Sequence, residues 1–299
     1  AVSAVLSKYG QGGAILEQDG PANVSQPQRI KVKAFLSAQR ITALPEIEQA
    51  LWHLGQLYPI PPPSMRWLSE EDWAQAWKSD YTTQYIGRRI VIKPSWLPYT
   101  GSLDEIVIGL DLGLVFGTGL HPSARLCLVA LEDYLQPGDR VLDVGTGSGI
   151  LSIAAAKLGA DTVVALDIDG VALEVARENI ARNGVETTIS VRRASLSPLP
   201  TLGSVDSPVQ LFNAHGAMNA SFDLLLMNIL PDAIAASAKA IAACLATDGL
   251  FAVSGIIQSR ESFVREALGS ADLAVISRRA DKDWVALIGR KENGQSDTA

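Results

Sequence analysis

Hydrophobic and polar positions alternate most regularly between residues 120 and 260. Short apolar runs typical of buried strands alternate there with apolar positions three and four residues apart, the spacing of a helix that covers a core. We predict helices at 123–135, 150–158 and 171–183, and strands at 140–144, 162–167, 189–193, 222–227 and 250–256. Strands that alternate with helices indicate an α/β fold with a mostly parallel sheet and helices on both faces.

The last two strand-like runs, 274–279 and 284–289, are separated by only a short polar turn. A connection this short favours an antiparallel C-terminal hairpin over another helical crossover. Between two core strands, segment 197–221 combines Pro, Gly, Ser, Asn and His without a periodic pattern. We expect it to be a long surface insertion.

The first part of the chain, residues 1–68, predicts a separate small α+β domain. Its clearest signal is the strand-like alternation from Ile30 to Phe35. Prolines between positions 59 and 63 end its last helix, because proline cannot donate to a helix ladder. The other elements expected here are a helix near 2–8, a strand near 14–17, a loop at 18–28 and a helix at 45–57.

Residues 69–84 predict a linker helix. Ser69 is a capping residue, and the acids after it suit the helix dipole. Trp73 and Trp77 lie four apart on one face, and packing explains this pair better than a ligand cage. A large domain then covers 85–293, with additional strands at 88–93 and 106–110, and a tail covers 294–299.

Composition limits the classes of function. The 299 residues suffice for two domains, and 47% hydrophobic with 19% charged residues is typical of a folded protein. The formal charge of −7 argues against general nucleic-acid binding, which needs a basic surface. There is no apolar run of membrane-spanning length and no signal-peptide pattern, so we expect a cytoplasmic protein. Cys127 and Cys244 lack neighbouring metal ligands, and we interpret them as reduced core thiols and expect no metal site.

The strongest candidate for chemistry is residues 141–149, Val-Leu-Asp-Val-Gly-Thr-Gly-Ser-Gly, an apolar strand that runs into three glycines and then a helix. Glycines let a backbone turn sharply and a ligand approach closely, and the amides of a helix N-terminus face that ligand. The pattern G-x-G-x-G alone is only moderately specific. In the dinucleotide fingerprint the third glycine comes one residue later, which disfavours pyrophosphate binding.

Two carboxylates accompany this turn. Asp167 ends the next strand, where a carboxylate can accept both ribose hydroxyls of an adenosine. The alternative is that it caps the helix at 171–183, but Asp169 is better placed for capping. Asp143 precedes the first glycine and either orients the turn, approaches the amino group of a ligand, or is purely structural.

Asn228 follows the strand at 222–227 and should face the same cleft, because ligands of open α/β sheets lie outside the carboxyl ends of the strands. Its amide can accept a hydrogen bond from an attacking amine. The alternative is a buried Asn satisfied by local backbone. Residues 116–123, Phe-Gly-Thr-Gly-Leu-His-Pro-Ser, form a defined turn at a helix start, suited to a lid or a carboxylate site. Within it, His121 is either a catalytic base or a cap.

The chain resembles the methyltransferase family that modifies large-subunit ribosomal protein L-eleven (L11), the PrmA type. The resemblance covers most of the chain and rests on residues 72–78, 116–122, 141–151 with 167–169, 228–230 and 282–290. It implies a Rossmann-like class I methyltransferase sheet, a small N-terminal domain that recognises the ribosomal protein, and methylation of its α-amino group and lysine side chains. The implied cofactor is S-adenosylmethionine, and the implied partner is L11.

Carried over by position, the family implies cofactor contacts at Gly145, Asp167, Asn228 and position 124. That last position is Ala124 here, where the family usually has threonine, so a hydroxyl contact is missing unless Ser123 substitutes. Segment 197–221 is a second departure. The complete set of expected cofactor-binding residues is Phe116, Gly117, Thr118, Ser123, Ala124, Asp143, Gly145, Thr146, Gly147, Asp167, Ile168 and Asn228.

Methyl transfer from a sulfonium to an amine is an in-line displacement, so alignment and water exclusion matter more than a strong base. We expect Asn228 to be the catalytic residue that aims the amine, and Phe116 to lie near the sulfonium through cation–π attraction. Three alternatives stay open: another protein or amine substrate, a nicotinamide oxidoreductase, and a binding module that has lost activity, which Ala124 keeps open. We expect a monomer.

Overall fold

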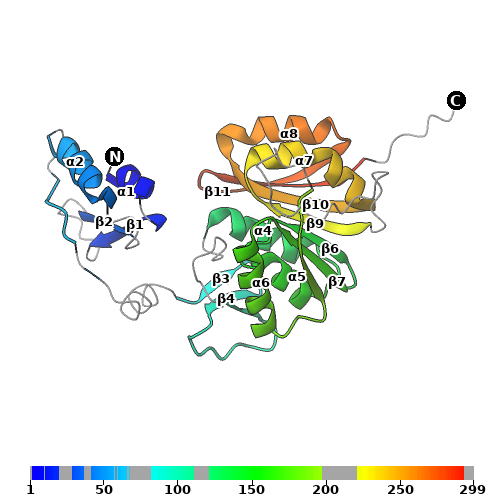
Figure 1. The fold of residues 1–299 in the computed structure, drawn as a ribbon. Helices are drawn as coiled ribbons and strands as arrows, with labels where there is room; N and C mark the ends of the chain where they lie inside the picture. Colours follow the sequence, from blue (N-terminus) through cyan, green and yellow to red (C-terminus); the bar gives the residue numbers. More distant parts are fainter. Residues whose placement is uncertain are drawn as a thin grey trace. The chain divides into compact units, whose positions relative to one another are not determined.

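A computed structural model describes residues 2–9, 11–19, 29–36, 42–56, 58, 60–65, 67, 82–110, 121–196 and 221–292 of the chain. The chain divides into two compact units, Ala1–Lys78 and Ser79–Ala299 (Figure 1). The predicted linker helix and insertion lie almost entirely outside the described residues. The domain boundary at residue 68 therefore stays a prediction.

The first unit is a small α+β structure. Helix α1 (Val2–Tyr9) precedes strands β1 (Gln11–Asp19) and β2 (Arg29–Phe35), which pair antiparallel, and helix α2 (Leu44–Gly55) follows. Pro45 lies in the first turn of α2, and Ile47 and Leu51, one turn apart, are buried. These elements match the predicted ones, with β1 longer than expected.

The second unit contains a seven-stranded sheet of order β11-β12-β10-β9-β6-β7-β8. Strands β10, β9, β6, β7 and β8 are parallel, and β12 pairs antiparallel with β10 and β11, as the predicted C-terminal hairpin requires. The strands are β6 (Arg140–Val144), β7 (Thr162–Asp167), β8 (Ile189–Arg193), β9 (Phe222–Asn228), β10 (Leu245–Ile257), β11 (Leu273–Asp281) and β12 (Trp284–Lys291).

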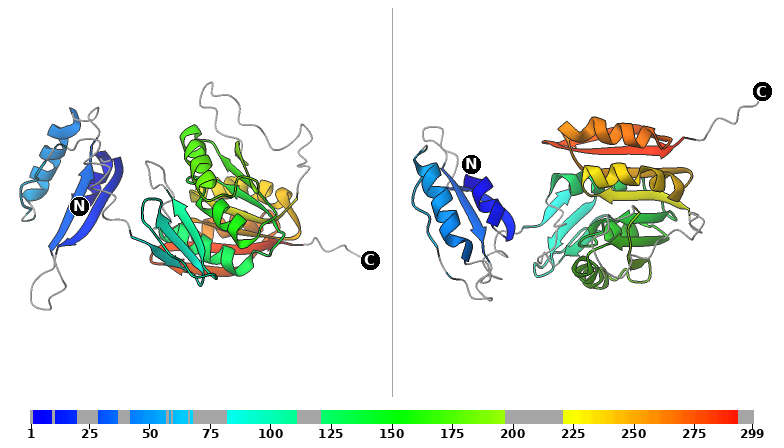
Figure 2. Two further views of the ribbon diagram at one scale, coloured as in Figure 1. Left: turned by 90° about the horizontal axis from the view of Figure 1, so that it is seen from below. Right: turned by 45° about the horizontal axis from the view of Figure 1, so that its top comes forward.

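Helices cover both faces of this sheet (Figures 1 and 2). One face carries α4 (Pro122–Tyr134), α5 (Ile150–Leu158) and α6 (Gly170–Arg182). The other carries α7 (Pro231–Cys244) and α8 (Glu261–Gly269), which the sequence pattern did not predict. A short 3-10 helix, Gln258–Arg260, separates β10 from α8. Among the described residues, no helix is long and apolar enough to cross a membrane.

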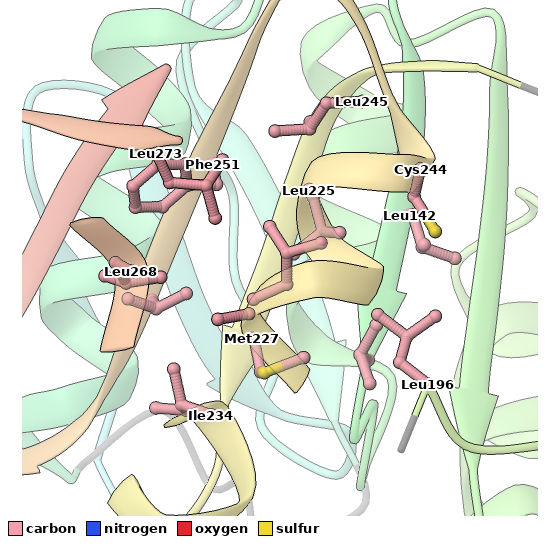
Figure 3. Packing of buried hydrophobic residues seen from close by; sticks show 14 of the residues in the cluster. Leu142, Leu196, Leu225, Met227, Ile234, Cys244, Leu245, Phe251, Leu268 and Leu273 are labelled. Atoms are coloured by element: carbon pink, nitrogen blue, oxygen red, sulfur yellow. The ribbon is translucent and has the colours of Figure 1, made fainter. Parts of the chain in front are cut away.

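A hydrophobic core lies between the sheet and the helices α7 and α8 (Figure 3). Leu142, Leu225 and Phe251 project into it from three neighbouring strands and are fully buried. Each such side chain stabilises the fold by roughly 1.5–3 kcal/mol through burial. Cys244 packs in this core, Cys127 is buried on α4, and both thiols are free, as predicted. The packing favours one strand register, since a slip by one residue would move these side chains to the other covered face and bring the charged Asp143 into this core.

A separate three-stranded sheet consists of β3 (Gln84–Ile86), β4 (Ile90–Pro94) and β5 (Ile106–Leu110). The predicted strand at 88–93 was wrong at its start, because residues 87–89 form a turn between β3 and β4. Gly87 has φ +62°, and the carboxylate of Glu132 on α4 accepts hydrogen bonds from the backbone amides of Arg88 and Arg89. A contact from a distant helix thus defines this turn.

Candidate functional site

The carboxyl ends of β6, β7 and β9 lie side by side at one edge of the sheet. Asp143 pairs in register with Ala165 on β7 and with Leu226 on β9. Since side chains two residues apart in a strand share a face, Asp143, Asp167 and Asn228 project to the same face. That face is covered by α4, α5 and α6 (Figure 1), and Ser152 on α5 donates a hydrogen bond to Asp143. Burial and, secondarily, the charge of Asp143 raise the pKa of the Cys127 thiol on α4. The three predicted polar residues are therefore brought together.

The glycine turn follows β6 directly. Gly145, Gly147 and Gly149 have φ values of +75°, +55° and +82°, which glycine adopts without strain. The amides of Gly145 and Thr146 donate to the carbonyl of Leu166 at 2.8 and 2.9 Å, which ties the turn to β7. Gly149 is then the N-cap of α5. The turn predicted from the glycine pattern is confirmed in its backbone.

Gly145 also has no room for a side chain. A Cβ atom at this position would lie 2.3 Å from Cγ2 of Ile229, the residue after β9. Gly255 on β10 is packed just as closely, with its Cβ position 2.2 Å from the carbonyl oxygen of Ile229. The ends of β6, β9 and β10 therefore converge on Ile229, whose importance the sequence pattern did not reveal.

Asp143 is fully buried beneath the glycine turn. Its Oδ2 accepts hydrogen bonds from the hydroxyls of Ser152 at 2.6 Å and Thr146 at 2.7 Å. Its Oδ1 is buried and has no hydrogen-bond partner among the described residues. Burial raises the pKa of the Asp143 carboxyl to about 6, although both hydroxyl hydrogen bonds lower it. Asp143 thus orients the turn, one of the roles expected from the sequence, and keeps one free acceptor.

Asp167 holds the middle of the same turn. Its Oδ2 accepts from the Gly147 amide at 2.9 Å, and its Oδ1 accepts from the Asp169 amide at 3.0 Å. The α6 cap is Asp169, whose carboxylate accepts from the amide of Val171, so the capping alternative for Asp167 was wrong. A carboxylate can accept about four hydrogen bonds, which leaves Asp167 free to accept hydroxyl groups as well. Ile168 beside it is 48% exposed.

Asn228 ends β9, and its side-chain Oδ1 is buried without a hydrogen-bond partner in the described part of the chain. This contradicts the alternative in which local backbone satisfies the side-chain oxygen. Leaving a buried acceptor unsatisfied costs roughly 1–3 kcal/mol. A ligand or substrate group that donates to Asn228 would recover that free energy.

The start of α4 answers the question about His121. This residue is the N-cap of α4, where its Nδ1 accepts from the amide of Ser123 and lies 2.7 Å from the Ser123 hydroxyl. The imidazole packs edge-on against Trp284, with 4.4 Å between ring centroids, and partial burial lowers its pKa. The capping interpretation is supported. Ser123 and Ala124 are both buried, and Phe116, Gly117 and Thr118 lie outside the described residues.

Two supporting residues were missed by sequence reasoning. Ser152 on α5 binds Asp143, and the buried side-chain amide of Asn179 on α6 donates to the carbonyl of Ser148 at 2.9 Å. A signal for Asn179 did exist, since a polar residue there interrupts the apolar face of α6 formed by Ala172, Leu173, Ala176 and Ile180. No group of residues suited to holding a metal ion occurs in the described ranges.

Known proteins are similar to this chain both in sequence and in structure. The family model described as ribosomal protein L11 methyltransferase (PrmA) matches residues 1–292. A ribosomal protein L11 methyltransferase of Chloroflexus aurantiacus is 41% identical, over 97% of this chain and 93% of its own length. One from Listeria monocytogenes is 38% identical, over 95% and 85%. The crystal structure of a ribosomal protein L11 methylase from Lactobacillus delbrueckii subsp. bulgaricus is similar with a TM-score of 0.61 and 31% identity, covering 71% of this chain and all of that one.

Proposed function

We propose that this chain, which belongs to the ribosomal protein L11 methyltransferase (PrmA) family, transfers methyl groups from S-adenosylmethionine to the α-amino group and lysine side chains of ribosomal protein L11. The names of its relatives supply the substrate. The observation that supports the chemistry is the convergence of the glycine turn, Asp167 and the unpartnered Asn228 oxygen on one face of the sheet edge.

The residues at this edge fit S-adenosylmethionine. The glycine turn offers backbone without side chains, and Asp167 has acceptor capacity left for ribose hydroxyls. The free Oδ1 of Asp143 and that of Asn228 are acceptors suited to an ammonium group or an amine. Ile168 and the glycine turn would contribute apolar and backbone contacts. A nicotinamide dinucleotide is disfavoured by the glycine spacing.

When bound, S-adenosylmethionine supplies an electrophilic methyl group on a sulfonium. We assign Asn228 the positioning of the nucleophile: its Oδ1 accepts a hydrogen bond from a neutral amine, and the lone pair then points along the line of attack. An α-amine, with a pKa of about 8, is partly neutral already, whereas a lysine with a pKa of about 10.4 must first lose a proton.

Four expectations stay predictions: that residues 1–68 recognise the substrate, that residues 69–84 form a linker, that the chain is a monomer, and that it makes no contacts with nucleic acid. A ribosomal substrate would place the reaction in the cytoplasm. Ala124 and Ser123 are buried, and the Ser123 hydroxyl already contacts His121. We therefore expect the cofactor to bind without the hydroxyl that the family usually has at position 124.

The direct test is incubation of the chain with S-adenosylmethionine and purified L11, followed by mass spectrometry of the added methyl groups. We expect methylation at the N-terminus and at lysines. Asn228→Ala should lose roughly 100-fold in kcat, because misplacing a nucleophile costs on this order. Full turnover in that variant would refute the role of Asn228. Thermal stabilisation by NAD and none by S-adenosylhomocysteine would refute the proposed cofactor.

A further inference from the structure

A hollow of about 380 Å³ lies in the second unit between α4, the β3–β4 turn and the end of β11. Its apolar lining comes from Ile86, Leu126 and Val129. Its charged lining comes from Arg125, Arg279 and Asp281. We call it the α4 hollow. Its volume suits a few amino-acid side chains, since ligand pockets run from about 300 to 1,000 Å³.

Hydrogen bonds and ion pairs hold one wall of the α4 hollow in place. The Glu132 carboxylate accepts from the amides of Arg88 and Arg89 at 2.6 and 2.7 Å, which fixes the β3–β4 turn against α4. Asp133, the next residue on α4, pairs with Arg88 at 2.5 Å and also with Arg279 on β11. These hydrogen bonds and ion pairs connect the small sheet, α4 and β11, the three elements that surround the α4 hollow.

Two arginines that line the α4 hollow have hydrogen-bond donors without an acceptor among the described residues. The guanidinium of Arg125 makes no hydrogen bond or ion pair within the described residues, in contrast to those of Arg88 and Arg279. Arg279 binds Asp133 through one terminal nitrogen, but its Nε is buried and has no partner in the described part of the chain. A planar guanidinium is matched best by a carboxylate or a phosphate.

The lining favours a carboxylate on a protein over a nucleic-acid phosphate. Asp281 places a negative charge in the same hollow, and the whole chain carries a net charge of −7. A nucleic-acid backbone would be repelled by both, because its binding depends on neutralising many phosphates. The apolar surface of Ile86 and Val129 instead suits the side chain beside an acidic residue in a peptide.

A chain of contacts leads from the α4 hollow to the start of α4, which follows the predicted lid segment. Asp281 pairs across the hairpin with Trp284, and Trp284 packs against His121 at the start of α4. The Arg125 amide donates to the His121 carbonyl at 3.2 Å, so Arg125 lies one turn along α4 from that contact. A protein that presents an amine to Asn228 would lie close to this end of the hollow.

We propose that the α4 hollow is a docking site for a segment of the protein substrate, in which an acidic side chain pairs with Arg125 and its neighbour packs between Ile86 and Val129. This inference rests on the proposed function, because it requires a protein substrate. Arg125 is a positioning residue: it acts through the substrate's location and does not touch the reacting atoms.

The test compares Arg125→Ala with Arg290→Ala, which removes the same charge from an exposed position at the opposite end of the sheet. For Arg125→Ala we expect an increase of about tenfold in KM for L11 and in the Kd of the L11 complex, since charged hydrogen bonds are worth this much. The kcat value and the affinity for S-adenosylhomocysteine should stay unchanged. Arg125→Lys should recover part of the loss, and Arg290→Ala should match the unaltered chain.

The outcomes separate the two proposals. If the unaltered chain methylates L11 and Arg125→Ala behaves like Arg290→Ala, the docking site is refuted and the proposed function stands. If the chain binds S-adenosylhomocysteine but neither binds nor methylates L11, both fail. Loss of affinity for an RNA hairpin with unchanged affinity for L11 would also overturn the docking site, in favour of nucleic acid.

Discussion

Replacing Gly145 with alanine is expected to destabilise the fold and to close the candidate site at the same time. Two effects add at this position. The backbone has φ +75°, a conformation that costs an L-residue about 1–2 kcal/mol. The new Cβ would also lie 2.3 Å from Cγ2 of Ile229, and such overpacking costs about 1–3 kcal/mol. We therefore expect a loss of about 2–5 kcal/mol in the free energy of unfolding.

Urea denaturation of the whole chain measures this loss, with S-adenosylhomocysteine titration as a second readout. The matched control is Gly170→Ala at the start of α6, where a Cβ would meet nothing within 4 Å. That change should leave stability the same or raise it by up to about 1 kcal/mol. Adding Ile229→Ala to Gly145→Ala removes the clashing methyl but not the backbone strain. Because Ile229 itself packs against the core, the comparison is with Ile229→Ala alone, against which the double variant should show only the strain part of the loss. Equal stability of Gly145→Ala and Gly170→Ala would refute the reasoning.

Two further predictions concern the carboxylates. Burial raises the pKa of Asp143 to about 6 in the folded chain from 3.8, so the folded state favours the neutral carboxyl. The free energy of unfolding is therefore highest at low pH, and it falls as the pH rises from about 4 through 6. The stability of Asp143→Asn relative to the unaltered chain should therefore rise by about 2 kcal/mol between pH 4 and pH 7 in urea denaturation, and a constant difference would contradict the burial of a charged carboxylate. Asp167→Ala removes both the acceptor of the Gly147 amide and the proposed ribose acceptor. It should weaken S-adenosylhomocysteine binding by at least about tenfold in calorimetry, whereas an unchanged affinity would exclude Asp167 from the site.

The local pattern of apolar residues was enough to predict the strands of the seven-stranded sheet. It was not enough to predict contacts between elements that are distant in the sequence. The core strands could be predicted because fully buried strands are continuous apolar runs, such as that of Leu224 to Met227 on β9. The start of β4 could not, because the turn before it depends on Glu132, more than forty residues away. Helix α7 was missed for another reason: it is rich in alanine on every side, so its buried stripe of Ile234, Ala238 and Ile241 contrasts only weakly with its exposed face.

The same division applies to the candidate site. The glycine turn and the Asp169 cap could be predicted from adjacent residues, because turns and caps are local. The hydrogen bond from Ser152 to Asp143 depends on how α5 packs over the end of β6, and the contact of Asn179 with the turn depends on α6. Neither distance can be read from spacing along the chain.

The unpartnered oxygens connect the stability of this edge with its function. Asp143 and Asn228 lie on neighbouring strands, project to one face, and each keeps a buried oxygen without a donor among the described residues. Each such atom costs roughly 1–3 kcal/mol, and a fold selected for stability alone would have replaced or satisfied both. A ligand that donates to them recovers this free energy only when it binds, so binding and folding are coupled at the strand ends. This coupling accounts for two unpartnered polar groups beside the glycine turn, where donors of a cofactor and an amine would meet them.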